Sequence, residues 1–323
     1  MNIVINNIPV DVLEGETLLE CAKRIGYKIP SLCYSKGAKH KSSCMVCAVK
    51  NCVSGQIIPS CTTLPTEGMI LDTEGEEVQL VRTLSLELLL SDHRADCDAP
   101  CSTVCPYGLD IERMIWYYDN NNYKQAHAML SQVFKLTELG CDSCKAPCEK
   151  ICRRKSIDKA VSIREIIKEL ANMENNQVLQ AIENNVKSDS KAYQSLLGRF
   201  SADEKIFLKE KVASKSRCLH CACLGKKYCK LRIYATGSNI KRSRYNIQSE
   251  LPVMEKIYVR DNIWFEPAKC IRCGLCVYNS ENGFTFKDRG FGMQVALPKE
   301  NKLNIKDTIV DICPTGALYT IDI

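Results

Sequence analysis

The sequence has no long apolar run and no nucleotide-binding glycine motif. No stretch approaches about 18 consecutive apolar residues, and the first dozen residues alternate in polarity instead of joining a basic flank to an apolar segment. We therefore expect a cytoplasmic protein with neither a signal peptide nor a membrane span. No Gly-x-Gly-x-x-Gly sequence follows a predicted strand and no P-loop is present, so neither common nucleotide-binding motif is available to this chain.

Catalytic residue patterns are missing as well. The chain has 323 residues and only 4 histidines, and no serine, cysteine or carboxylate pair forms a recognisable catalytic constellation. With 45% hydrophobic and 25% charged residues, the composition is that of a globular protein long enough for two or three domains. We expect no active site in this chain.

Cysteine is the residue that the chain has in excess. All but two of the 21 cysteines fall into groups with the spacing of metal ligands. Disulfides are rare in the cytoplasm, so these groups indicate metal binding, and their spacing favours iron–sulfur clusters. The two others, Cys21 and Cys52, are predicted to be buried structural thiols. The formal charge of +6 counts every cysteine as neutral, whereas a thiolate-bound cluster carries about −2, so the charge does not indicate nucleic-acid binding.

The N-terminal residues predict a hairpin followed by a helix. Residues 1–12 alternate as two short strands that turn at Asn6-Asn7. Thr17 and Glu20 form a capping box before an apolar helical face, and Gly26 ends that helix. The first cysteine group follows, with the spacing Cys33-x10-Cys44-x2-Cys47-x13-Cys61.

The flanking sequence of this group carries a family resemblance. Pro30-Ser-Leu-Cys33-Tyr34, Cys44-Met-Val-Cys47 and Cys61-Thr-Thr-Leu-Pro resemble the [2Fe–2S] domain at the start of the iron–sulfur subunit of NADH dehydrogenases and of complex [FeFe]-hydrogenases. The resemblance implies a β-grasp ferredoxin domain whose four cysteines ligate one [2Fe–2S] cluster. A zinc site at this spacing is the alternative.

The second group has an odd number of cysteines. A leucine-rich helix over residues 84–90 leads to His93, and seven cysteines follow it: Cys97-x3-Cys101-x3-Cys105 and Cys141-x2-Cys144-x3-Cys148-x3-Cys152. Two [4Fe–4S] clusters need eight ligands, and a neutral imidazole can replace one thiolate. His93-x3-Cys97 resembles the His-x3-Cys sequence of the same family, in which the histidine is a cluster ligand; a surface or capping histidine is the alternative.

Beyond Cys97 the chain resembles a different family, the small subunit of glutamate synthase. The resemblance is carried by Cys105-Pro-Tyr-Gly-Leu-Asp-Ile-Glu112, Asn122-Tyr-Lys-Gln-Ala126 and Cys144-x3-Cys148-Glu-x2-Cys152-Arg-Arg154. The matching domain, shared with dihydropyrimidine dehydrogenase, is helical and holds two [4Fe–4S] clusters. The resemblance implies interleaved ligand sets, namely His93, Cys97, Cys101 and Cys152 for one cluster and Cys105, Cys144 and Cys148 for the other, with Cys141 as candidate fourth ligand.

The middle of the chain predicts a helical spacer and then a compact cysteine module. Residues 157–173 have apolar residues at helical spacing, residues 174–191 are polar, and Ser201 to Glu204 form a second capping box. The module is Cys218-x2-Cys221-x-Cys223-x5-Cys229. Four thiolates this close can hold a [4Fe–4S] cluster or a zinc ion, and the neighbouring groups favour the cluster. His220, between two of them, is expected to be exposed.

Around this module the chain is strongly basic. Residues 211–245 contain ten lysines or arginines and no acidic residue. This charge either compensates an anionic cluster or forms a docking face for an acidic partner such as ferredoxin. Aromatic residues are too sparse there to indicate nucleic-acid binding.

The last group predicts a single cluster. Cys270-x2-Cys273-x2-Cys276 is followed by the remote Cys313-Pro-Thr-Gly. In two-cluster bacterial ferredoxins a fourth cysteine follows closely and serves the other cluster, but Val277 to Ser280 supply none. Cys313 is therefore the expected fourth ligand of one [4Fe–4S] cluster, as in the matching domain of the NADH dehydrogenase subunit, with zinc as the alternative.

These groups predict an α+β multidomain protein. The expected segments are a [2Fe–2S] ferredoxin-like domain (1–78), a helical domain with two [4Fe–4S] clusters (79–156), a helical spacer (157–215), the four-cysteine module (216–250) and a ferredoxin-like [4Fe–4S] domain (251–323). The cofactors would be one [2Fe–2S] and about four [4Fe–4S] clusters.

The expected function is one-electron transfer within a hetero-oligomeric oxidoreductase. The family resemblances imply a partner flavoprotein that binds FMN or FAD and uses NAD(P)H, in a complex that by analogy extends to electron-bifurcating enzymes. An iron–sulfur subunit of a hydrogenase or formate dehydrogenase complex is the alternative. An alternative of another class is a scaffold or regulatory protein that zinc or clusters stabilise.

Overall fold

The computed structural model describes residues 1–93, 96–135, 139–173, 216–223, 225, 228–240, 255–260, 262–297 and 308–320. The chain divides into two compact units. Unit 1 comprises Met1–Arg94, Gly225–Leu251 and Phe265–Thr320, and unit 2 comprises Ala95–Leu224, Pro252–Trp264 and Ile321–Ile323. The polar stretch 174–191, the capping box at Ser201 and part of the basic stretch 211–245 lie outside the described residues.

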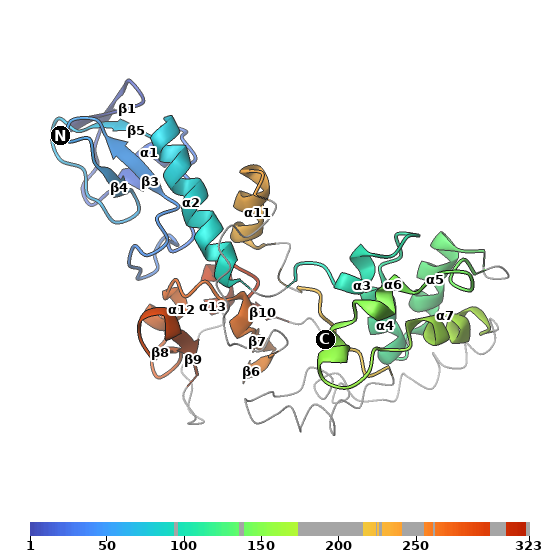
Figure 1. The fold of residues 1–323 in the computed structure, drawn as a ribbon. Helices are drawn as coiled ribbons and strands as arrows, with labels where there is room; N and C mark the ends of the chain where they lie inside the picture. Colours follow the sequence, from blue (N-terminus) through green and yellow to red (C-terminus); the bar gives the residue numbers. More distant parts are fainter. Residues whose placement is uncertain are drawn as a thin grey trace. The chain divides into compact units, whose positions relative to one another are not determined.

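Unit 1 begins with a five-stranded sheet that packs against two helices (Figure 1). Its elements are β1 (Asn2–Ile5), β2 (Ile8–Asp11), α1 (Leu18–Arg24), β3 (Ala48–Asn51), β4 (Ile57–Pro59), β5 (Ile70–Asp72) and α2 (Glu76–Asp92). The strand order is β2-β1-β5-β3-β4. The β1–β5 pair is parallel, and the other pairs are antiparallel.

The predicted hairpin and capping box are confirmed. Asn6 and Asn7 have positive φ values of 48° and 67°, which suit the short side chains of asparagine at a tight turn. The Thr17 side chain accepts from the backbone of Glu20, whose carboxylate in turn accepts from the Thr17 backbone N–H at 2.9 Å. The helix expected over residues 84–90 is longer, because α2 already begins at Glu76.

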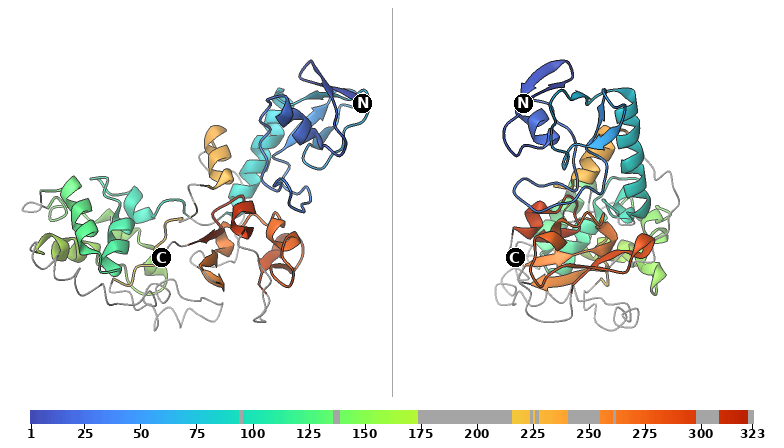
Figure 2. Two further views of the ribbon diagram at one scale, coloured as in Figure 1. Left: turned by 180° about the vertical axis from the view of Figure 1, so that it is seen from behind. Right: turned by 90° about the vertical axis from the view of Figure 1, so that its left-hand side faces the viewer.

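The rest of unit 1 consists of short elements around the last cysteine group. They are α11 (Lys230–Gly237), η3 (Pro267–Lys269), α12 (Leu275–Tyr278), β8 (Thr285–Lys287), η4 (Gly290–Gly292), β9 (Gln294–Ala296), α13 (Ile309–Ile312) and β10 (Leu318–Thr320). β8 and β9 form an antiparallel hairpin, and α11 contacts α2 along its side, as the two views of Figure 2 also show.

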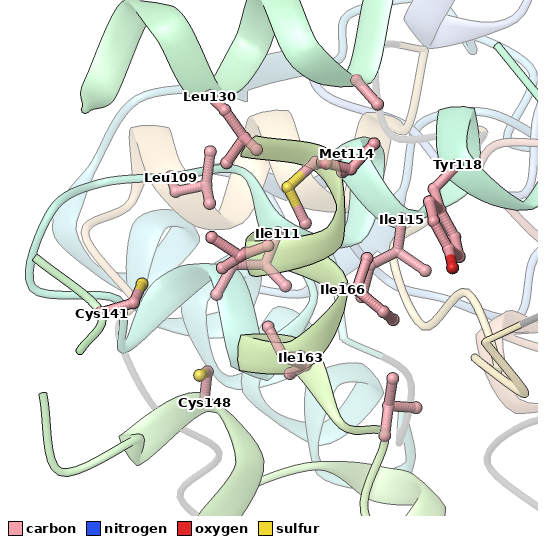
Figure 3. Close-up of a cluster of buried hydrophobic side chains, with 14 of the residues drawn as sticks. Leu109, Ile111, Met114, Ile115, Tyr118, Leu130, Cys141, Cys148, Ile163 and Ile166 are labelled. Atoms are coloured by element: carbon pink, nitrogen blue, oxygen red, sulfur yellow. The ribbon is translucent and has the colours of Figure 1, made fainter. Parts of the chain in front are cut away.

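Unit 2 is mainly helical. Its elements are α3 (Pro100–Thr103), α4 (Ile111–Asp119), α5 (Tyr123–Val133), α6 (Pro147–Lys150), η1 (Arg153–Ser156), α7 (Ile163–Ala171), β6 (Ile257–Arg260) and most of β7 (Ile263–Phe265). The apolar faces of α4, α5 and α7 form one core, which includes Met114, Leu130 and Ile166 (Figure 3). α7 starts later than the periodicity over 157–173 predicts. Within the described part of the chain, no helix is long and apolar enough to cross a membrane.

Candidate functional site

Four cysteines of unit 1 come together in the loops around β3 and β4. Cys33, Cys44, Cys47 and Cys61 are all buried, with exposed fractions of 6% or less. The thiol of Cys33 forms hydrogen bonds with those of Cys44 and Cys61, and the thiol of Cys47 with that of Cys61. These are the four residues that the sequence groups together. Four buried sulfurs in mutual contact fit a [2Fe–2S] cluster, in which four thiolates share two irons.

Hydrogen bonds between these thiols already favour negative charge at two of them. Donation from Cys44 holds the pKa of Cys33 well below its usual range, although burial opposes the shift. A hydrogen bond from Cys61 lowers the pKa of Cys47 to about 7. Hydrogen bonds with Cys33 and then with Cys47 raise the pKa of Cys61, and the hydrogen bond with Cys33 raises the pKa of Cys44. Iron binds the thiolate and not the thiol, so cluster binding would displace the protons that these thiols share.

Arg82 places a buried positive charge beside this site. Its side chain, 7% exposed, extends from α2 and donates two hydrogen bonds to the carbonyl of Ala48, at 3.1 and 2.7 Å. Burial lowers the pKa of Arg82 while the charge of Cys47 raises it, and an arginine stays protonated in either case. Sequence reasoning did not single out this residue, because it lies far from the cysteines along the chain.

We predict that Arg82→Met lowers the reduction potential of the [2Fe–2S] cluster. Reduction adds negative charge, and the variant removes the nearby cation that stabilises it. The matched control is Arg82→Lys, which keeps the charge but loses the two-pronged hydrogen bond. Redox titration followed by EPR should place Arg82→Lys closer to the unmodified protein than Arg82→Met. Equal potentials in all three proteins would contradict the electrostatic role.

A second set of four cysteines meets at the edge of the unit 2 core. Cys141 lies close enough to Cys105, Cys144 and Cys148 for their charges to interact, and Figure 3 shows Cys141 and Cys148 on the same side of the hydrophobic cluster. Burial raises the pKa of Cys141 to about 11 and that of Cys148 also to about 11. The structure thus places Cys141 beside the three cysteines for which it was the candidate fourth ligand. This donor set fits a [4Fe–4S] cluster.

The last cysteine group lines one cavity in unit 1. Cys270, Cys273, Cys276 and Cys313 surround it, together with apolar side chains. Burial raises the pKa of Cys273, Cys276 and Cys313. Remote Cys313 is held there because the Thr315 hydroxyl donates to the carbonyl of Lys269 at 3.0 Å. This set also matches the predicted ligands, and its four thiols fit a [4Fe–4S] cluster.

Cys229 lies beside this last group. The backbone N–H of Lys230 donates to the carbonyl of Pro314 at 2.8 Å, and the charges of Cys229 and Cys313 interact. A Cβ atom on Gly225 would lie 2.6 Å from the Cα of Gly316, so the two backbones can approach this closely only because residue 225 is a glycine. Cys218, Cys221 and Cys223 belong to unit 2, and the grouping Cys218–Cys229 stays a prediction.

The remaining predicted ligands are also divided between unit 1 and unit 2. His93, the C-terminal cap residue of α2, belongs to unit 1, whereas Cys97, Cys101 and Cys152 belong to unit 2. The charges of Cys101 and Cys152 interact. The carbonyl of Cys97 accepts a hydrogen bond from the N–H of Cys223 at 3.1 Å. The grouping of His93 with these three cysteines also stays a prediction.

The expectation that His220 is exposed is wrong. The side chain is 6% exposed and lies between two carboxylates of α4. Its Nδ1 atom is 3.0 Å from Oε1 of Glu112, and its Nε2 atom is 3.3 Å from Oδ2 of Asp119. Burial alone would lower the pKa of His220, but the hydrogen bonds and charges of Asp119 and Glu112 raise it. The two acids are seven residues apart, two helical turns, which places them on one face of α4; that spacing is the signal in the sequence.

The two cysteines outside the groups have different outcomes. Cys21 is buried in α1, as predicted. Cys52 was also expected to be buried, but it is exposed, because β3 ends at Asn51 and the chain turns there. Within the described residues, no set of three or more His, Cys, Asp or Glu side chains is placed to hold a single metal ion. The ligands of a cluster bind different irons, so they need not converge on one point.

Comparison with known proteins identifies two domains. Residues 1–76 match a family model described as a 2Fe-2S iron-sulfur cluster binding domain. Residues 87–179 match one described as dihydropyrimidine dehydrogenase domain II, 4Fe-4S cluster. The chain therefore has an α+β fold that includes a 2Fe–2S domain and a 4Fe–4S domain, and both suspected resemblances are confirmed.

Curated relatives match over about a third of this chain. One of the NADH-quinone oxidoreductase subunits of Rhizobium meliloti is 31% identical over 112 residues, which are 35% of this chain and 12% of that protein. NADP-reducing hydrogenase subunit HndD of Solidesulfovibrio fructosivorans is 38% identical over 102 residues, 30% of this chain and 17% of that protein. NADPH-Fe(3+) oxidoreductase subunit alpha of Geobacter sulfurreducens is 29% identical over 97 residues, 30% of this chain and 12% of that protein.

The fold as a whole is also found in a solved structure. A chain of an NAD+-reducing [NiFe]-hydrogenase in the H2-reduced state aligns with 99% of this chain and 86% of its own length, at a TM-score of 0.52 and 16% identity. At this identity the likeness concerns the fold. The chain is thus similar over about a third of its length to several oxidoreductase subunits, and it spans less than a fifth of these curated relatives.

Proposed function

We propose that this chain is an iron–sulfur electron-transfer subunit of a multi-subunit NAD(P)H-dependent oxidoreductase. Bound clusters would supply one-electron transfer, and the chain would relay single electrons between a flavoprotein subunit and a second redox partner. The proposal includes a β-grasp [2Fe–2S] domain, a helical two-cluster domain and a C-terminal ferredoxin-like domain. It also includes one [2Fe–2S] and about four [4Fe–4S] clusters, and a place in the cytoplasm.

The observation that carries this proposal is the contact between two cysteine sites in unit 1. Cys33 of the first set and Cys273 of the last set are close enough for their charges to interact. Both lie in one hydrophobic cluster, in which Leu32, Leu86 and Ile271 also pack. Two redox centres embedded side by side in apolar packing can exchange electrons without exposing either to water. A protein that used its clusters only as folding staples would not need them adjacent.

The partners follow from the relatives. Proteins named for NADH, NADP or NADPH chemistry match about a third of this chain. Such chemistry needs a flavin to divide the electron pair of a hydride into single electrons. We therefore propose a flavoprotein subunit with FMN or FAD as one partner and ferredoxin as a candidate second partner. An electron-bifurcating complex is the narrower form of this proposal. A hydrogenase complex is a second candidate, favoured by the 38% identity to a hydrogenase subunit.

Anaerobic purification with iron and sulfide analysis tests the proposal. We expect about 18 iron atoms per chain, from one two-iron and four four-iron clusters. Reduction should produce EPR signals of both cluster types. Near-stoichiometric zinc without a reducible signal would refute electron transfer and favour the zinc-stabilised scaffold. Full iron content that an NAD(P)H-reduced flavoprotein partner cannot reduce would instead favour clusters as structural staples.

A further inference from the structure

Four cysteines that the sequence assigns to two different groups line one cavity in unit 2. Cys101 lies on α3, Cys152 follows α6, and Cys218 and Cys221 lie on a loop more than sixty residues further along the chain. The cavity that they surround is also lined by apolar side chains, among them Ile115, Val161 and Ile163. The charge of Cys101 interacts with those of Cys221 and Cys152, and the charge of Cys218 with those of Cys221 and Cys101.

Unit 2 fixes the Cys218–Cys221 loop against α4 by several buried contacts. The backbone N–H of Ser216 donates to Asp119 at 2.9 Å, and its hydroxyl donates to the other carboxylate oxygen at 2.5 Å. His220 lies between Asp119 and Glu112, as described above. The Lys256 ammonium donates to the carbonyl of His220 at 2.9 Å. A buried polar network is stabilising only when all of its members are in place, so these contacts hold the loop in one position.

The loop has the same local conformation as the first two ligands of the last cysteine group. In Cys270-Ile-Arg272-Cys273, Arg272 has a φ of 55° and its N–H points to the Cys270 sulfur at 3.3 Å. In Cys218-Leu-His220-Cys221, His220 has a φ of 48° and its N–H points to the Cys218 sulfur at 3.4 Å. A non-glycine residue in the left-handed region is uncommon. Here it orients an amide toward a sulfur, an interaction that stabilises a thiolate ligand.

The charge around the cavity suits an anionic cluster. Arg153, paired with Asp96, and Arg154, paired with Asp158, line it together with Glu112, which lies against His220. The buried ammonium of Lys256 attracts the charge of Cys221. Arg154 is 2% exposed and donates to the carbonyl of Arg217, next to Cys218. A cluster with four thiolates carries a net charge of about −2, which a buried cation such as Lys256 stabilises.

From this arrangement we propose that Cys101, Cys152, Cys218 and Cys221 form one iron–sulfur binding site. This assignment rests on the proposed function, since it takes the cysteines to hold clusters. It combines two cysteines of the helical domain with two of the compact module, so that the module closes a site of the helical domain. The module would then not be an independent zinc or cluster site, and the iron content would be about 14 atoms per chain, four fewer than five separate clusters would give.

Iron content of alanine variants distinguishes one shared site from two separate ones. We expect Cys101→Ala and Cys218→Ala each to lose about four iron atoms and the same EPR signal. The double variant should lose no more iron than either single variant. Cys105→Ala combined with Cys218→Ala is the matched control, because these residues belong to different proposed sites and their iron losses should add. An additive loss for Cys101 with Cys218, and two different missing signals, would overturn the assignment.

A second measurement needs no variant and therefore does not depend on variant folding. The purified protein is titrated with an iron chelator under anaerobic conditions, and exposed thiols are alkylated and mapped by mass spectrometry. Cys101, Cys152, Cys218 and Cys221 should become reactive together. Separate transitions for Cys101 with Cys152 and for Cys218 with Cys221 would overturn the shared site. Absence of iron from the starting protein would instead refute the proposed function.

Discussion

Replacing Cys276 by alanine should sharpen the EPR signal of the [2Fe–2S] cluster. The variant loses a ligand of the last cysteine group and with it about four iron atoms. In the fully reduced protein, a paramagnetic four-iron cluster beside the [2Fe–2S] cluster broadens its signal and speeds its relaxation. Because Cys33 and Cys273 interact within one hydrophobic cluster, removal of the second cluster should leave a narrower and more slowly relaxing signal.

Power saturation of the [2Fe–2S] signal measures this effect. Cys276 is the suitable position, because Cys273 packs directly toward the first site and its replacement could disturb that packing. The control is Cys52→Ala, which removes an exposed thiol from the turn after β3 and should change neither iron content nor signal. A variant that loses the four irons and keeps an unchanged [2Fe–2S] relaxation would refute adjacency of the two centres. It would also remove the observation on which the relay depends.

Local features of this protein were predictable from the sequence. The Asn6-Asn7 turn and the Thr17–Glu20 capping box depend on residues within a few positions of one another, and both form as expected. The Cys33–Cys61 and Cys270–Cys313 sets follow established spacings, and the structure brings the members of each together. A sequence pattern predicts the structure reliably where it is compatible with only one local conformation.

The environment of Cys218 and Cys221 could not be predicted in this way. It depends on His220 meeting Glu112 and Asp119, about a hundred residues earlier in the chain. Spacing within the module alone favoured a closed set of four thiols and an exposed histidine. The contacts that bury His220 are long-range pairings of buried charges, and these leave only a weak signal in a single sequence. Cys52 shows the same weakness on a smaller scale, since its exposure depends on β3 ending at Asn51, just before it.

Replacing His220 by leucine should strongly destabilise unit 2. Leucine fills a similar volume but leaves the carboxylates of Glu112 and Asp119 buried without the imidazole between them. Glu112 is 7% and Asp119 is 9% exposed. Removing one partner of a buried ionic pair typically costs about 3–5 kcal/mol, because the remaining charge is left uncompensated. We expect a loss of this size in the free energy of unfolding, measured by urea denaturation of the anaerobic protein.

The control is His127→Leu, which makes the same substitution on α5 of the same unit at a half-buried histidine. It should cost less than about 1 kcal/mol, as surface substitutions do. Because His220 holds the Cys218–Cys221 loop to α4, the unfolding loss should be accompanied by weaker iron retention at that site alone. A His220→Leu protein as stable as His127→Leu would show that the carboxylates are neutral or hydrated in solution. Full stability with selective iron loss would instead mean that His220 acts on the cluster and not on the fold.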